Sequence, residues 1–80
     1  MGYEVWELLN IGGYRISDTD SLGTVRYYGF LQVDSKWYIM KEDTTNPVVT
    51  YRYIKGDSGY AAAWAGRAAL SYDTYDVIFR

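Results

Sequence analysis

Residues 24–55, "TVRYYGFLQVDSKWYIMKEDTTNPVVTYRYIK", decide the fold of this chain. Turn-forming and polar residues interrupt the stretch at Asp34-Ser35 and over 43–47. The segments between these interruptions are rich in β-branched and aromatic side chains, which favour strands. They are 24–33, 36–42 and 48–55. The stretch therefore predicts an antiparallel β-meander.

The pattern of side chains also predicts a register for these strands. A two-residue turn at Asp34-Ser35 would place Phe30 opposite Ile39, and a five-residue loop would place Ile39 opposite Tyr51. One face is then more apolar than the other, and we expect it to form the core. That face carries Phe30, Trp37, Ile39, Val49, Tyr51 and Tyr53. A slip of one residue would exchange the two faces.

The sequence changes character after the third segment, at "GDSGYAAAWAGRAALSYD" (56–73). Its alanines favour a helix, and we expect one over about 58–68. Asp57 or Ser58 precedes this segment and is a suitable cap, since its side-chain oxygen can accept from free backbone N–H groups.

The expected helix has one side that can bind a sheet. Tyr60 and Trp64 are four residues apart and share that side. A helix this short is not stable alone. We therefore expect Trp64, aided by Leu70, to pack on the aromatic face of the sheet. Arg67 is expected to pair with an acidic residue or to stack on an aromatic ring.

The two ends of the chain are less regular. Residues 1–23 predict an irregular N-terminal segment. Within it, 3–11 reads as a strand or as one helical turn, 14–17 as a short strand, and 18–23 as a loop. The C-terminal segment 71–80 reads as a last strand or as an arm that docks on a neighbour. The whole of 1–80 is predicted to form a single, mainly β domain, a small antiparallel meander of three or more strands with one short helix packed on its aromatic face.

Composition excludes several classes of function. The 80 residues include no cysteine and no histidine, which removes disulfides and the commonest general base. The eight Lys and Arg residues are scattered and the net charge is −2, which argues against nucleic-acid binding. No apolar run approaches the roughly 20 residues of a membrane span. A cysteine-free chain is also compatible with synthesis in a reducing cytosol.

Two short motifs have chemical associations that the rest of the sequence does not support. The segment "DTDSLG" (18–23) resembles the start of a calcium-binding loop, but the position that needs a glutamate is Gly29. The segment "GDSG" (56–59) resembles the loop of a serine nucleophile, but the chain has no histidine to act as its base. We expect no metal, no cofactor and no enzymatic activity.

Aromatic residues make up 19% of the chain, with ten tyrosines and three tryptophans. Such residues fill small β-rich cores and are enriched in protein interfaces. We favour this use over a sugar-stacking platform. The expected structural core is Phe30, Trp37, Ile39, Tyr51, Tyr53, Trp64, Arg67, Leu70 and Tyr72. The expected assembly contacts are Tyr3, Val5, Trp6, Leu8, Leu9, Tyr75, Val77, Ile78 and Phe79.

The run from Trp37 to Tyr72 resembles a group of small structural proteins of tailed phages. The matching pieces are "WYIMKED" (37–43), "YRYIKGDS" (51–58) and "WAGRAALSY" (64–72). The most specific piece is a W-x-x-R-x-x-L-x-Y motif that follows Gly56-Asp57. Its residues are Trp64, Arg67, Leu70 and Tyr72.

The resemblance implies a virion component that is made in the host cytoplasm. Its role would be capsid decoration, or that of a tail or fibre adaptor subunit, in many copies or as a homo-oligomer in contact with other virion proteins. Two alternatives stay open. One is a glycan-binding surface module of a phage fibre, and the other is a small phage-encoded inhibitor of a host protein.

Overall fold

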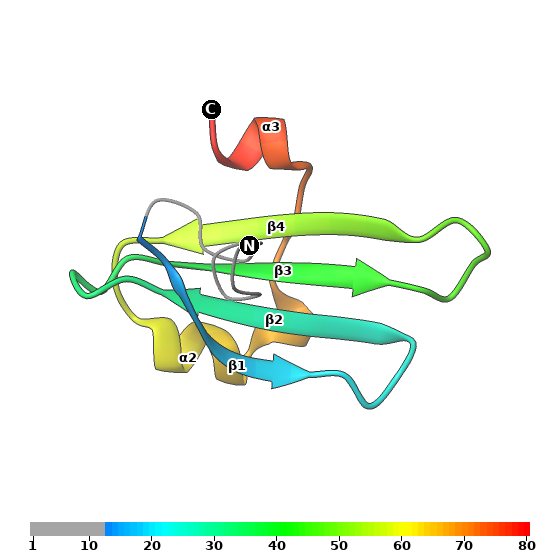
Figure 1. The fold of residues 1–80 in the computed structure, drawn as a ribbon, viewed down its shortest axis with the longest axis horizontal. Coiled ribbons are helices and arrows are strands. Elements are labelled where there is room, and N and C mark those ends of the chain that lie inside the picture. Colours follow the sequence, from blue (N-terminus) through cyan, green and yellow to red (C-terminus); the bar gives the residue numbers. More distant parts are fainter. Residues whose placement is uncertain (1–12) are drawn as a thin grey trace, which may run out of the picture.

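The computed structural model describes residues 13–80, which form one four-stranded antiparallel sheet with helices on both of its faces. The strands are β1 (Arg15–Asp20), β2 (Val25–Leu31), β3 (Trp37–Asp43) and β4 (Thr50–Gly56), followed by helix α2 (Tyr60–Ala65), the 3₁₀ turn η1 (Arg67–Ala69) and helix α3 (Tyr75–Ile78). The strands lie side by side in chain order, with α2 near β1 and β2, and α3 beside β4 (Figure 1). This confirms the predicted meander class.

The first edge strand extends further than expected. A short strand was expected over 14–17 and a loop over 18–23, whereas Arg15–Asp20 pair with β2 from Arg15↔Leu31 to Asp20↔Tyr27. Alternation is hard to see there because a bulge interrupts it between Ile16 and Asp18.

The register predicted for β2 and β3 was wrong by one residue. Phe30 lies opposite Tyr38, and Ile39 lies opposite Gly29. The connection is a three-residue loop in which Ser35 adopts a left-handed φ of 76°. Asp-Ser lacks the glycine that a tight two-residue turn favours, so the chain closes instead with the longer loop.

The register predicted for β3 and β4 was also wrong, by three residues. Ile39 lies opposite Ile54 rather than Tyr51, and the ladder continues to Asp43↔Thr50. Pro47, which has no N–H to donate and was expected to favour a strand start or an edge, therefore lies within the loop before β4. A hydrogen bond within the loop stabilises its conformation: the N–H of Thr45 donates to Asp43 Oδ1 at 2.9 Å.

These registers divide the expected apolar face between two sides of the sheet. We call the side that binds α2 the α2 face; it carries Tyr27, Gly29, Trp37, Ile39, Lys41, Ile54 and Gly56. We call the opposite side the α3 face; it carries Arg26, Tyr28, Phe30, Tyr38, Met40, Glu42, Tyr51, Tyr53 and Lys55. Both faces bury side chains: Ile39 is fully buried on one and Phe30 on the other.

Two glycines on the α2 face let aromatic rings approach the backbone, and one of them, Gly29, lies under helix α2. A Cβ on Gly29 would lie 2.9 Å from Tyr60 Cζ and 3.0 Å from Trp64 Cε3, so only a glycine lets both rings approach. At Gly56, the indole of Trp37 covers the backbone and donates from Nε1 to Ser58 O at 2.6 Å. The helix therefore packs on a strip of exposed backbone.

The helix begins and ends inside the predicted range. Its N-cap is Gly59, with a left-handed φ of 74°, and no side chain caps it, so the expected cap at Asp57 or Ser58 was wrong. Gly66 ends it, and the 3₁₀ turn follows.

The C-terminal segment turns onto the other face of the sheet. Asp73 forms an isolated bridge to Tyr53 on β4, with two backbone hydrogen bonds of 2.7 and 2.9 Å. Beyond it the chain forms α3, whose Tyr75 and Phe79 rings contact Tyr53 on the α3 face. Apart from the bridge at Asp73, the last residues therefore form a short helix that packs on the chain's own sheet, and not the last strand considered from the sequence.

Candidate functional site

On the α2 face, residues of the W-x-x-R-x-x-L-x-Y motif connect α2 to β1. We call the contacts made by Trp64, Arg67 and Tyr72 the latch. The Arg67 guanidinium donates through Nε and Nη2 to Asp20 Oδ2, at 3.2 and 2.9 Å, and through Nη1 to Trp64 O at 2.7 Å. Its carbon Cζ lies 4.4 Å from the centroid of the Trp64 ring. One side chain therefore joins the edge strand β1 to the end of α2.

Tyr72 completes the latch. Its hydroxyl donates to Arg67 O at 2.8 Å, and its ring lies 5.9 Å from that of Tyr27, centroid to centroid. The Lys41 Nζ lies 4.9 Å from the centre of the same ring. Burial raises the pKa of the Tyr72 phenol above its ordinary value.

The bulge in β1 brings two carboxylates to this latch. Ile16 lies on the α3 face opposite Phe30, and regular alternation would place Asp18 and Asp20 on that same face. The register shift turns them to the α2 face instead. There, Tyr60 donates to Asp18 Oδ2 at 2.7 Å, and Asp20 meets Arg67. The acidic segment that looked like an ion-binding loop is therefore part of the fold.

The α3 face has a hollow beside the part that α3 covers. It has a volume of about 410 Å³, and we call it the face hollow. Its walls come from β1, β2, β3 and β4. They are Ile16, Tyr28, Phe30, Met40, Glu42 and Tyr51.

The face hollow has one polar end, formed around Glu42. The Tyr28 hydroxyl donates to Glu42 Oε1 at 3.2 Å, and the Tyr51 hydroxyl donates to Oε2 at 2.9 Å. Arg26 Nη1 lies 3.6 Å from Oε1. The hydrogen bond from Tyr51 to Glu42 is the main cause of the raised pKa of Tyr51. The pKa of Tyr28 is raised mainly by burial and then by its own hydrogen bond to Glu42. The carboxylate is thus surrounded by donors.

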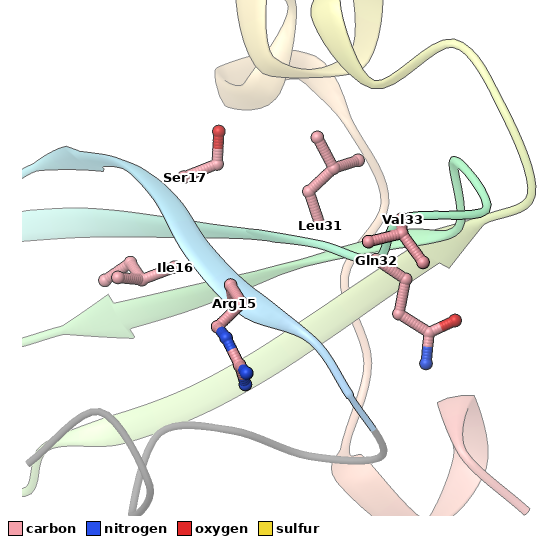
Figure 2. A pocket seen from close by; sticks show the side chains of 6 residues that line it. All are labelled: Arg15, Ile16, Ser17, Leu31, Gln32 and Val33. Atoms are coloured by element: carbon pink, nitrogen blue, oxygen red, sulfur yellow. The ribbon is translucent and has the colours of Figure 1, made fainter. Parts of the chain in front are cut away.

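A second hollow, of about 320 Å³, lies at the sheet edge and is the edge hollow (Figure 2). Figure 2 shows Ser17 and Leu31 on one side of the strands, and Arg15 and Gln32 on the other. Its lining is Arg15, Ile16, Ser17, Leu31, Gln32 and Val33. The hollow therefore lies over the first residues of β1 and the end of its partner β2.

The expected core residues lie in different places. Phe30, Trp37 and Ile39 are buried, whereas Tyr53, Trp64, Arg67, Leu70 and Tyr72 are half-buried. Tyr51 is 44% exposed, contrary to expectation, because its strand is shifted relative to the predicted register.

The expected assembly contacts also divide into two groups. Tyr3, Val5, Trp6, Leu8 and Leu9 lie outside the described residues. At the other end, Phe79 packs on Tyr38 and Tyr53 of its own sheet, with centroid distances of 5.2 and 5.8 Å, while Val77 is 39% exposed.

Sequence reasoning missed Tyr38 and Glu42. Tyr38 is buried and stacks on Phe30 at 4.4 Å, and burial raises the pKa of its phenol. Its position in the centre of the aromatic segment 36–42 was the available signal, but the shifted register assigned it to the outer face. Nothing local in the sequence marks Glu42 as the meeting point of two tyrosines.

The described part of the chain contains no group of three or more carboxylates that could hold a metal ion. None of the helices within residues 13–80 has the length and apolar character of a membrane span. Comparisons with protein-family models, with curated proteins and with solved structures found no match to this chain. The functional argument therefore depends on its own residues.

Proposed function

We propose that this protein is a structural component of a tailed-phage virion, as a capsid decoration protein or as a tail or fibre adaptor subunit. It acts through protein–protein contacts and not by catalysis. The sequence support is the resemblance over 37–72. Its most specific residues build the latch between α2 and β1, so the motif has a use in the fold that requires no chemistry.

The observation that carries the contact role is a difference between the two sheet edges. At β4, Asp73 pairs with Tyr53 and engages the edge. At β1, no described residue pairs with the outer side of Ser17–Asp20, because β2 is the one neighbour of this strand within residues 13–80. An open edge can accept a strand from another subunit.

The edge hollow supports the same contact. Strand addition gains affinity from backbone hydrogen bonds and selectivity from adjacent side-chain pockets. The hollow offers apolar walls at Ile16 and Leu31, next along β1 from the stretch Ser17–Asp20, and Ile16 is 41% exposed. A neighbouring strand with an apolar side chain would be held by both features.

The first experiment is mass spectrometry of purified phage particles, with the copy number measured against the major capsid protein. We expect the chain to be present in many copies. Its absence from particles would contradict the virion assignment, whatever the properties of the isolated protein.

The second experiment tests the edge. Thr19→Lys places a charge on β1, and charged side chains on an edge strand oppose pairing. We expect this variant to lose self-association in light scattering and incorporation into particles. Leu22→Lys adds the same charge at a fully exposed turn position outside the strand, and it should behave as the wild type. Equal behaviour of the two variants would exclude the β1 edge as the contact.

A further inference from the structure

We propose that the face hollow binds a neutral saccharide ring. This is a second activity, and it does not depend on the assembly role of the β1 edge. The hollow falls in the size range of small-molecule sites, and it combines mainly apolar walls with a few convergent polar groups, as such sites do.

The walls of the hollow suit the apolar side of a sugar. Phe30 is buried at its base, and Ile16 and Met40 add aliphatic surface around it. The partly exposed ring of Tyr51 gives a wall that a ligand can reach. A pyranose has one such C–H side, which can lie against these groups.

The polar end suits the hydroxyl groups of the same ligand. The Tyr28 and Tyr51 hydroxyls both donate to Glu42, so each phenol oxygen keeps lone pairs that can accept from a ligand O–H. Arg26 has a half-exposed side chain beside the same carboxylate and can donate from its remaining N–H groups. Donors and acceptors therefore lie together at one end.

Charge decides between a saccharide and the other ligands that an aromatic hollow can take. Arg26 lies 3.6 Å from Glu42, so the carboxylate is already compensated and gives an organic cation little net attraction. A wholly apolar ligand would cover the phenols and the carboxylate without replacing the water that they bind. A neutral ligand with both C–H and O–H surfaces needs no net charge in the hollow, and its hydroxyl groups can replace the hydrogen bonds that the phenols and the carboxylate make with water.

Met40 provides a direct probe of this site. The chain has only two methionines, Met1 and Met40, and Met40 lines the hollow. Its methyl resonance can be followed in ¹³C-methyl-methionine-labelled full-length protein during titration with glucose, galactose, N-acetylglucosamine and maltose. We expect a saturable shift of the Met40 methyl with at least one of these sugars, with Kd in about the millimolar range for so small a ligand.

The variants separate the site from general effects on the fold. Tyr51→Ala removes a wall and should abolish the shift. Tyr51→Phe keeps the ring, loses the hydroxyl and should weaken binding about fivefold, the size expected of one hydrogen bond to a neutral hydroxyl. Tyr75→Phe is the matched control: Tyr75 is 47% exposed and lies outside the hollow, so this variant should bind as the wild type. Circular dichroism should show all three variants folded.

Four outcomes would overturn the proposal. In the first, the Met40 methyl resonance does not shift with any sugar, even at a concentration well above the expected Kd. In the second, it shifts equally in the wild type and in Tyr51→Ala. In the third, the resonance shifts with tetramethylammonium but with none of the sugars, which would show that the hollow binds cations. A response that appears only after deletion of residues 1–12 would show that the hollow of the full chain is not available to a ligand.

Discussion

The two faces of the sheet are covered in different ways. On the α2 face, Gly29 lets the helix approach the backbone, and directional contacts from Asp18 to Tyr60 and from Asp20 to Arg67 fix its position. On the α3 face, Phe79 and Tyr75 cover part of the sheet through ring contacts, and the face hollow remains beside them. The first face specifies one geometry, whereas the second buries area with less demand on position.

The sharpest test of this difference is Gly29→Val. Its side chain would meet the rings of Tyr60 and Trp64. Tyr60 is hydrogen-bonded to Asp18 and Trp64 contacts Arg67, so neither ring can move away without losing a contact. We expect a loss of about 3 kcal/mol of unfolding free energy, at the upper end of the range for overpacking. Gly23→Val is the control, since a Cβ there meets nothing closer than 4.0 Å. Urea denaturation measures both; equal losses would show that α2 can retreat from the sheet.

A smaller effect is expected from Phe79→Ala on the α3 face. The ring contacts Tyr38, Tyr53 and Tyr75, but it is half-buried, so the loss should be about 2 kcal/mol, below that of a fully buried phenylalanine. Val77→Ala alters a more exposed side chain of the same short helix and should change stability by less than about 0.5 kcal/mol. If Phe79→Ala unfolds no more easily than the wild type, α3 does not stabilise the sheet.

The latch should respond to the geometry of its cation and not only to its charge. Arg67→Ala should cost about 1–2 kcal/mol, because it removes a forked contact to Asp20 that is about a quarter exposed. Arg67→Lys keeps the charge, cannot reach Asp20 and Trp64 O together, and should recover less than half of the loss. On the α3 face, Arg26→Ala breaks a longer ion pair whose arginine is 40% exposed, and it should cost less than about 0.5 kcal/mol in the same denaturation assay.

The smallest expected effect is a dependence of stability on alkaline pH. Burial raises the pKa of Tyr38 above its ordinary value of 10.0, so the unfolded chain loses this proton first. The free energy of unfolding is therefore unaffected below pH 10 and falls as the pH rises above it. Tyr38→Phe removes this group and should make the fall between pH 10 and pH 11 shallower. A fall of unchanged slope would assign the effect to other tyrosines, such as Tyr60 and Tyr72, whose pKa values are also raised by burial.

The class of fold could be predicted from the sequence, because strand propensity and the alanine-rich segment are local signals. The registers could not, because each depends on the conformation of one loop. Ser35 adopts a left-handed conformation, which is uncommon for serine, and the loop that contains it places Trp37 and Phe30 on opposite faces rather than on the one face that was predicted. The bulge at β1 is a similar case, since it is stabilised by Tyr60 and Arg67, more than 40 residues away.

The candidate sites were predictable to a smaller extent. The motif from Trp64 to Tyr72 was recognised as important, and Arg67 was expected to pair with an acid or stack on a ring; it does both. The face hollow was not foreseen, because its polar end joins Tyr28, Glu42 and Tyr51 from three strands whose alignment was wrong. Sites built across a sheet need the register before they can be seen.

The bridge between Asp73 and Tyr53 has a consequence for stoichiometry. A sheet with two open edges can extend without limit, as in fibrils, since each added strand offers a new template. Here the tail bridges the β4 edge at Tyr53, and within residues 13–80 only β2 pairs with β1. If two copies met through β1, each outer margin of the pair would carry a tail, which would oppose the addition of a further strand there.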